Sequence, residues 1–184
     1  MKKNSLIQAA ILVSFGLCAT EHPITPVKNT ENPGSFYVAS QVKTGVTCIK
    51  NEDGRYIFRI DAKDDLKKLI SGTRIKIEQG DTMTLKLKLK VRAKASLGTG
   101  FYIYSGKIKY ITALYTPNME LTPEKTDYTF TGVVQKNPDE ASAFDRPAVG
   151  IIFFDAKKGC DFDIEKIEFE VKHAPAEKVT IPEF

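Results

Sequence analysis

The stretch Asp81 to Ala95, which reads DTMTLKLKLKVRAKA, alternates strictly between two kinds of residue. One parity is apolar: Met83, Leu85, Leu87, Leu89, Val91, Ala93 and Ala95. The other parity is polar and mostly basic: Thr82, Thr84, Lys86, Lys88, Lys90, Arg92 and Lys94. Because successive side chains of a strand point to opposite faces, this pattern predicts a long β-strand with one apolar face. A helix would scatter the lysines around its circumference. Such a strand needs paired neighbours and a second layer over its apolar face, which predicts a sheet packed on a sheet.

Residues 1–18 have the character of an export signal. Two lysines precede an apolar segment, residues 6–17, that is too short to cross a bilayer as a helix. The end of the signal allows two interpretations. Cys18 is lipidated as in a bacterial lipoprotein, although Leu17 stands where a small residue is expected, or the chain is cleaved after Cys18 or Ala19. Both predict an exported protein, which is periplasmic, a cell-surface lipoprotein or secreted, and which meets a membrane only through a lipid anchor.

The remaining chain suits one domain. We expect residues 19–34, which contain three prolines among polar residues, to form a flexible tether. Residues 35–173 are expected to form a β-sandwich domain, and residues 174–184 a C-terminal tail, because turn signals recur about every ten residues across the middle of the chain. The formal net charge of +4 includes the two lysines of the signal, so the domain carries too small an excess to predict a nucleic-acid partner.

Two cysteines remain in the domain, Cys48 and Cys160. Outside the cytoplasm, an even pair far apart in sequence is a candidate for a disulfide. The alternative is that both are buried free thiols, since unpaired cysteine is often simply part of a core.

Three local signals refine the sandwich. Asn51 to Gly54 has the composition of a hairpin loop. Asp61 to Ser71 has leucines at helical spacing, acids in its first turn and Gly72 at a capping position, which predicts one short helix. In the last strand, Phe162 to Val171, the apolar parity changes after Ile164, so we expect a β-bulge at Glu165–Lys166 that keeps its apolar residues on one face.

A second hairpin is predicted to carry an aromatic and basic patch. If Ser105 and Gly106 form a tight turn, Tyr104 lies opposite Lys107, Ile103 opposite Ile108, and Tyr102 opposite Lys109. The core face then holds Phe101, Ile103, Ile108 and Tyr110. The outer face holds Tyr102, Tyr104, Lys107 and Lys109, where tyrosines can stack on a ligand and lysines can bind hydroxyl or carboxylate groups. The alternative is a solvated hairpin whose tyrosines cover neighbouring strands.

Three segments together resemble the jelly-roll carbohydrate-binding modules of the galactose-binding-like superfamily, which accompany xylanases and cellulases. Phe162 to Phe169, FDIEKIEF, is similar to their closing strand, which tends to read Phe-Tyr-Ile-Asp-Asp-Val-Ser-Leu. Leu121 to Phe130, LTPEKTDYTF, is similar to their Leu-Thr-x-Glu-Trp motif followed two residues later by Tyr-Thr-Phe, and Gly80 to Leu85 to their entry into a central strand. The resemblance implies an all-β, two-sheet jelly-roll β-sandwich, here with one short helix, that binds sugars.

This chain departs from the family at two positions. Lys125 replaces the tryptophan of the motif, and the chain has no tryptophan at all, so any stacking on sugar rings falls to tyrosines. The structural calcium common in the family is not expected here, because Glu165–Lys166 replaces the paired aspartates. Asp161 and Asp163 remain nearby as oxygen donors, but two carboxylates do not make a calcium site. We therefore expect no cofactor.

Catalysis is not expected. The two histidines, His22 and His173, lie in the predicted tether and just past the last strand, which argues against a Ser-His-Asp or Cys-His arrangement inside the domain. Paired carboxylates could still serve a glycosidase, but the acids cluster in loops and at outward strand positions, where solvated surface is the simpler explanation.

The predicted function is non-catalytic binding of a polysaccharide or oligosaccharide through a sheet face. The candidate ligand-binding residues are Tyr102, Tyr104, Tyr115, Lys107, Lys109 and Arg92. The basic row Lys86 to Lys94 could line a groove for acidic glycans, or could be an outer face paired with acids such as Glu168 and Glu170. The tyrosines and this row would form one site only if they share a face. The alternative function is a cell-surface structural or adhesion protein that contacts another surface protein.

Overall fold

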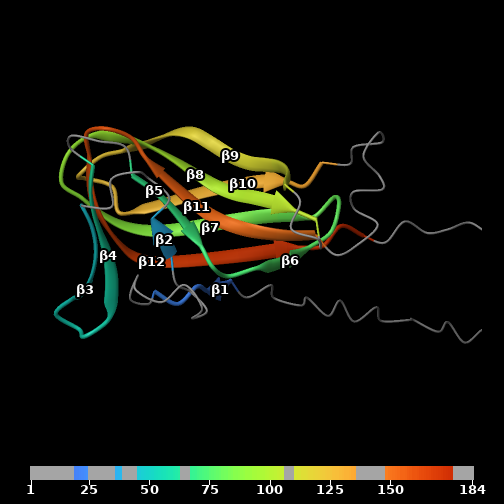
Figure 1. Ribbon diagram of the computed structural model, residues 1–184, viewed down its shortest axis with the longest axis horizontal. Coiled ribbons are helices and arrows are strands. Elements are labelled where there is room, and N and C mark those ends of the chain that lie inside the picture. Colours follow the sequence, from blue (N-terminus) through green and yellow to red (C-terminus); the bar gives the residue numbers. More distant parts are fainter. Residues whose placement is uncertain are drawn as a thin grey trace, which may run out of the picture.

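The computed structural model describes residues 19–24, 36–38, 45–62, 67–105, 110–135 and 148–175. They form two antiparallel sheets of six strands that pack face to face as a β-sandwich (Figure 1). The predicted all-β, two-layer class is therefore confirmed. The predicted export signal with Cys18, the two lysines Lys107 and Lys109, and all but the first two residues of the predicted C-terminal tail lie outside the described residues. No helix in the described ranges is long and apolar enough to cross a membrane.

The first sheet, which we call sheet A, has its strands in the spatial order β10 (Asp127–Val133), β7 (Thr82–Val91), β12 (Cys160–Lys172), β4 (Tyr56–Ala62) and β3 (Val46–Lys50), with β1 (Thr20–Glu21) also paired to β12. The second sheet, sheet B, has the order β2 (Phe36–Val38), β5 (Lys67–Ser71), β11 (Ala148–Ala156), β8 (Ala95–Tyr104) and β9 (Tyr110–Leu121), with β6 (Ile75–Ile77) also paired to β11.

The alternating stretch forms strand β7, whose apolar side chains from Met83 to Val91 are all buried in the core. The strand ends at Val91 and not at Ala95, because the backbone N–H of Arg92 donates to Asp161 O and the chain then turns into β8 of the other sheet. Gly98 and Gly100 lie within β8 and are buried.

The predicted bulge in the last strand is confirmed. The pairing of β12 with β7 shifts register between Ile164 and Lys166, so that Glu165 is the extra residue. Ile164 and Ile167 are both fully buried as a result. The predicted hairpin loop Asn51–Gly54 is confirmed too, since it joins the paired strands β3 and β4.

The predicted helix at Asp61 to Ser71 is wrong. The described residues contain no helix, and this part of the chain is the end of β4 and the whole of β5, separated by residues 63–66, which lie outside the described residues. In β5, Lys67, Leu69 and Ser71 face inward with period two. Pairing on both edges, with β2 and β11, outweighs the modest helix preference of so short a segment.

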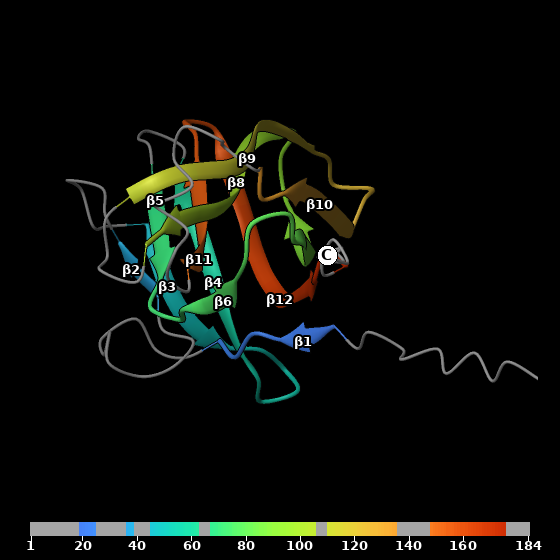
Figure 2. The ribbon, with the colours of Figure 1, turned by 90° about the vertical axis from the view of Figure 1, so that its right-hand side faces the viewer.

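The predicted tether begins as part of the fold. Thr20 and Glu21 pair with Phe169 and Glu168 of β12 (Figure 2), and the side chain of His22 is buried. The tether prediction is therefore wrong for residues 19–24, because an open edge of β12 provides partners for their backbone. Residues 25–35 lie outside the described residues.

The disulfide prediction is also wrong, because Cys48 and Cys160 are free thiols. They lie on opposite sides of β4, where Cys48 pairs with Phe58 and Cys160 with Ala62. Two strand spacings sideways and four residues along the strand separate their Cα atoms by roughly 16 Å. A disulfide requires about 4.4–6.8 Å.

The hairpin between β8 and β9 is wider than predicted. Tyr104 pairs with Tyr110, and Ile103 pairs with Thr112, so no two-residue turn closes at Ser105–Gly106. Tyr110 is consequently 53% exposed instead of facing the core. Strand β9 also continues through Pro117, which is possible because β9 is an edge strand and one of its sides needs no backbone donor.

Candidate functional site

The outer face of sheet B carries a groove of about 290 Å³. Alternation along β8 places Gly98 and Gly100 outward, where the absence of side chains lowers the floor between the flanking strands. A Cβ atom on Gly100 would lie 2.1 Å from the carbonyl oxygen of Leu114, so no larger residue fits there. The described residues that line the groove are Lys68, Gly98, Tyr102, Tyr110, Ala113, Tyr115, Pro117, Phe153, Asp155 and Lys157.

Aromatic rings form much of the wall. Tyr102 stacks on Phe153 with their ring centroids 4.0 Å apart and 12° between their planes. Tyr115 lies 6.2 Å from Phe153 and is 54% exposed, and Tyr110 meets Tyr102 edge to face. The stacked rings of Tyr102 and Phe153 therefore hold each other in place in the wall of the groove, while the rings of Tyr110 and Tyr115 are exposed to solvent.

Polar groups lie among these rings. The Nζ atom of Lys68 is 5.6 Å from the ring centroid of Tyr102, and a hydrogen bond with Tyr102 raises the pKa of Lys68 above its ordinary value. Lys157 donates to the side-chain oxygen of Asn118. The Oδ1 atom of Asp155 is buried and has no hydrogen-bond partner among the described residues. A buried acceptor without a donor is unusual in a folded protein.

Of the six predicted ligand-binding residues, the structure brings together Tyr102 and Tyr115 in this groove. Tyr104 lies beside it, half-buried, with its ring 5.8 Å from that of Tyr110. Arg92 is on the other sheet. Lys107 and Lys109 cannot be placed, because they lie outside the described residues.

Eight of the ten described lining residues were missed by the analysis of the sequence, among them Lys68, Tyr110, Phe153 and Asp155. Lys68 was assigned to the predicted helix and Tyr110 to the core. In β11 both parities are apolar up to Phe154, so the sequence does not show that Phe153 faces outward. Asp155 gave the one available signal, since it is the single charged residue at the end of that apolar run.

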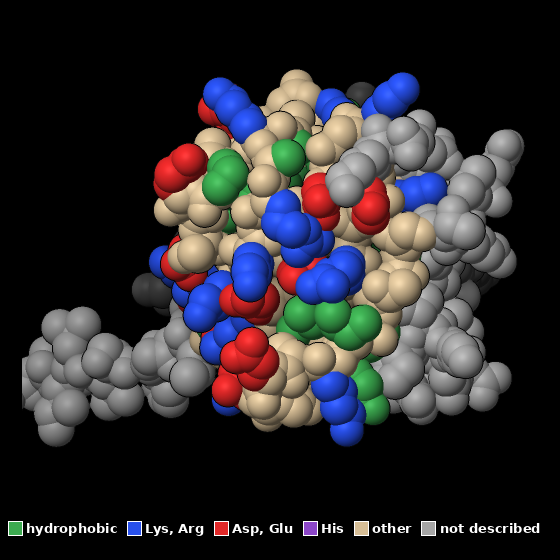
Figure 3. All heavy atoms as spheres, turned by 90° about the vertical axis from the view of Figure 1, so that its left-hand side faces the viewer, with side chains coloured by type: hydrophobic (Ala, Val, Ile, Leu, Met, Phe, Trp, Pro, Cys, Tyr) green, Lys and Arg blue, Asp and Glu red, His purple; other side chains and the backbone are tan. Residues whose placement is uncertain are grey.

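The basic row lies on the opposite side of the molecule, on the outer face of sheet A. Lys86 Nζ is 3.5 Å from Glu170 Oε2, and Lys94 Nζ is 3.0 Å from Glu120 Oε1. A groove of about 540 Å³ on this face has four basic side chains and four acidic ones among its described lining. Figure 3 shows a side of the molecule where Lys and Arg side chains lie beside Asp and Glu side chains. These pairs favour the interpretation of the row as a charge-compensated outer face.

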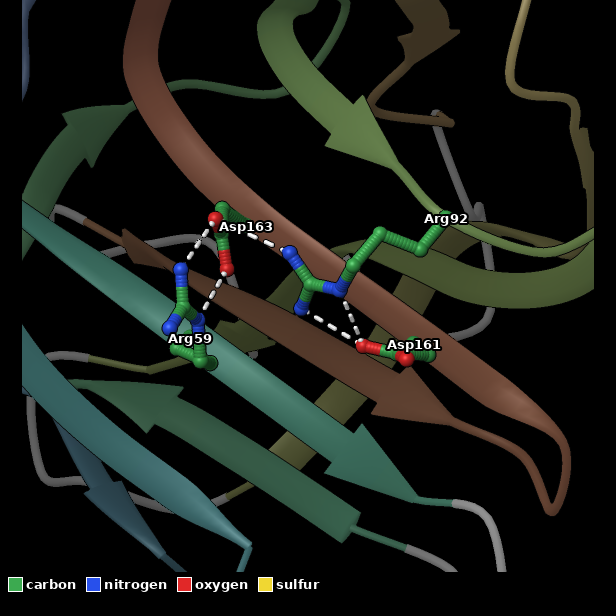
Figure 4. A network of polar contacts seen from close by, with 4 residues as sticks. All are labelled: Arg59, Arg92, Asp161 and Asp163. Atoms are coloured by element: carbon green, nitrogen blue, oxygen red, sulfur yellow. Dashed lines mark hydrogen bonds and ion pairs between the residues drawn. The ribbon is translucent and has the colours of Figure 1, made fainter.

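Arg92 belongs to a compact ion-pair network on the same face (Figure 4). Its Nε atom lies 2.6 Å from Asp161 Oδ1, and its Nη1 atom lies 3.0 Å from Asp163 Oδ2. Arg59 binds both oxygens of Asp163, at 2.9 and 3.0 Å. Burial alone would raise the pKa of Asp163, but the hydrogen bonds from Arg59 and Arg92 outweigh burial and hold that pKa below its usual range. The two carboxylates considered as calcium donors are thus held by arginines.

Comparison with known proteins shows the fold. No family model and no curated protein matches the sequence. Among solved structures, the second N-terminal cellulose-binding domain of β-1,4-glucanase C from Cellulomonas fimi matches with a TM-score of 0.54 and 16% identity, over 85% of this chain and 97% of that one. The CBM22-1 xylan-binding domain of a Paenibacillus barcinonensis xylanase matches with a TM-score of 0.50 and 9% identity, over 86% and 96%.

A longer structure matches in part. The CBM22-1 and GH10 modules of a Clostridium thermocellum xylanase, complexed with xylohexaose, give a TM-score of 0.56 at 8% identity, over 85% of this chain and 28% of that one. This chain likewise spans 23% of the length of an arabinose-bound α-L-arabinofuranosidase. The resemblance to jelly-roll carbohydrate-binding modules is therefore confirmed for the fold.

Proposed function

We propose that this protein binds a polysaccharide or oligosaccharide, without catalysis, in the groove on the outer face of sheet B. The observation that carries the proposal is the combination of exposed tyrosine rings with a buried, unpartnered carboxylate oxygen in one groove. Sugar rings present C–H faces that pack on aromatic rings, and their rims carry hydroxyl groups that need polar partners. Tyr110 and Tyr115 supply ring surface, and Asp155 supplies an acceptor for a hydroxyl group.

The composition of the lining supports binding without hydrolysis. Glycoside hydrolysis commonly uses two carboxyl groups on either side of the bond to be cleaved. Asp155 is the one acidic residue among the described residues that line the groove. The solved structures with this fold include a cellulose-binding domain and a xylan-binding domain, which agrees with a glycan as ligand. The export signal predicted at residues 1–18 would place the protein where such polymers occur.

Affinity electrophoresis tests the proposal. The protein from Ala19 to Phe184 is run through gels that contain neutral or acidic polysaccharides, at low and at high salt. We expect retardation that persists at high salt, because stacking and hydrogen bonding are screened far less than exposed charges are. Tyr115→Ala should weaken the affinity tenfold or more, which corresponds to about 1.4 kcal/mol. Its ring is more than half exposed, so the substitution leaves the fold intact.

Tyr56→Ala is the matched control. Tyr56 is also an exposed tyrosine, but it lies on β4 of the other sheet, under Lys50. We expect its retardation to equal that of the unmodified protein. Retardation only by acidic gels at low salt would mean that the surface acts as a polyelectrolyte and would contradict the proposal. No retardation in any gel would favour the alternative of a surface protein that contacts another protein.

A further inference from the structure

The N-terminal segment of the fold covers an edge that its own sheet leaves open. Strand β4 pairs with β12 from Cys160 to Ile164, and the pairing stops there, although β12 continues to Lys172. Beyond that point, Thr20 pairs with Phe169 and Glu21 with Glu168, and the backbone N–H of His22 donates to Ile167 O at 2.8 Å. Figure 2 shows β1 running beside β12 at this edge. Two paired residues alone hold a strand poorly, so its docking depends on what anchors it.

The anchor is the imidazole of His22, which is 1% exposed. Its ring centroid lies 5.2 Å from that of Phe36 on β2 and 6.4 Å from that of Phe169 on β12. Nε2 lies 2.8 Å from Ser71 Oγ on β5, and Nδ1 lies 3.0 Å from Pro23 O. This one side chain therefore joins the N-terminal segment to both sheets.

These hydrogen bonds fit the neutral imidazole. Pro23 O can only accept, so Nδ1 carries a proton and donates it. Ser71 Oγ accepts from the backbone N–H of Thr73 at 3.0 Å, and its own proton is available to donate to Nε2. Burial lowers the pKa of His22 below its ordinary value, against the opposing effect of its backbone hydrogen bonds. A second proton would place a charge in a buried site between two phenylalanine rings.

The charged groups on the strands around His22 have partners other than His22. Glu21 on β1 is exposed, and its nearest basic partner is Lys166. On β12, Glu168 pairs with Lys166 and Glu170 with Lys86. On β5, the basic residues Lys67 and Lys68 precede Ser71, and Lys68 binds Tyr102. Among these described groups none is a carboxylate bonded to His22, so a protonated imidazole has no counter-ion in the docked segment.

We propose that His22 is a pH-sensitive latch, which docks residues 19–24 against the edge of β12 at neutral pH and releases them in acid. The direction of the pH dependence follows from the difference in proton affinity between the docked and the released histidine. The released histidine binds a proton near pH 6.5, whereas the docked one resists it, so docking is complete above about pH 6.5 and weakens as the pH falls. The docking equilibrium should fall by up to about tenfold per pH unit below that value.

Release would lengthen the connection to the N-terminus. Release frees residues 19–24 from the edge of β12, and these six residues could then extend by up to roughly 20 Å. The latch would thus set how far the domain reaches from whatever holds its N-terminal end.

Hydrogen exchange of the protein from Ala19 to Phe184, which contains every described residue, tests the latch. Amide exchange is measured at pH 7.5 and 5.5 and corrected for the intrinsic effect of pH. We expect the amide of His22 to lose protection by up to about tenfold at pH 5.5, while the amides of β7 keep theirs. His22→Phe, which keeps an aromatic ring but cannot titrate, should remove this dependence on pH. His173→Gln is the control, because it removes the other of the two histidines and should leave the dependence unchanged.

The same pH-dependent loss in His22→Phe, or no loss in the unmodified protein, would overturn the proposal. If His22→Phe does not dock at any pH, an NMR titration of the unmodified protein decides. We expect the imidazole of His22 to titrate below pH 6.5, together with the loss of protection at its amide. Titration at or above pH 6.5 would overturn the latch.

Discussion

Replacing Asp155 by alanine should stabilise the free protein and weaken its binding to glycans. A buried oxygen without a hydrogen-bond partner destabilises a fold by about 1–3 kcal/mol, and Asp155→Ala removes it. The substitution also removes the attraction to Lys68 and Lys157 in the same groove, about 0.2–1 kcal/mol for each partly exposed pair. The difference is a gain of about 1 kcal/mol, or roughly 2–4 °C in Tm for a domain of this size.

The two effects are measured on the same variant, by thermal unfolding followed with circular dichroism and by affinity electrophoresis. We expect Tm to rise while affinity falls tenfold or more. A fall in Tm would mean that Asp155 supports the fold, which would refute our reasoning about its unpartnered oxygen. A rise in Tm with unchanged affinity would mean that the glycan does not use this acceptor.

Asp163→Asn is the matched substitution on the other sheet and should have the opposite effect. The side chain of Asp163 is 2% exposed and bonded to Arg59 and Arg92, so loss of its charge should destabilise the fold by about 2 kcal/mol and leave glycan binding unchanged. Because the folded state lowers the pKa of Asp163, its contribution is present above the unfolded pKa of about 3.9 and is lost as the pH falls through the folded value. The difference between the two proteins in urea unfolding should therefore shrink below about pH 4.

Three further substitutions or measurements test the fold. Gly100→Ala should unfold the protein or lower its stability by at least about 2 kcal/mol, measured by urea unfolding, because a Cβ atom would collide with Leu114 O. Tyr128→Phe should lower stability by about 1 kcal/mol, since the buried hydroxyl bonds three backbone groups of the loop before its strand. A thiol reagent should label partly exposed Cys48 slowly in the native protein and buried Cys160 only after unfolding, and a disulfide in the oxidised protein would contradict the observed spacing.

Periodicity predicted the part of the fold in which every second residue is buried. In β7 the alternation of leucine with lysine specifies both the strand and its inward face, and it is confirmed from Thr82 to Val91. The change of parity in β12 also predicted the bulge, because only an inserted residue lets Ile164 and Ile167 both face the core. Such patterns are local, and a single sequence shows them directly.

The wrong predictions of the short helix and of the tether both depended on pairing between distant segments. Lys67 faces inward in β5 because strands from two other regions of the chain take up both edges of this segment, which composition does not show. His22 is buried because the pairing of β4 with β12 stops at Ile164 and leaves an edge of β12 open. Arg92, which the sequence analysis offered as a polar partner for a sugar, has Asp161 and Asp163 beside it on the neighbouring strand.

The two aspartates explain why charge was a poor guide to the site and why unmet hydrogen bonding is a better one. Asp163 and Asp155 both lie at outward positions on central strands, one on each sheet. Arg59 on β4 and Arg92 just after β7 bind the two oxygens of Asp163, so this face can be rigid and stable without a ligand. Asp155 keeps a buried oxygen without a partner among the described residues, in a groove walled by exposed tyrosines. Under the proposed function, a glycan hydroxyl group supplies the donor that Asp155 lacks on sheet B, while the paired charges of sheet A hold the fold together.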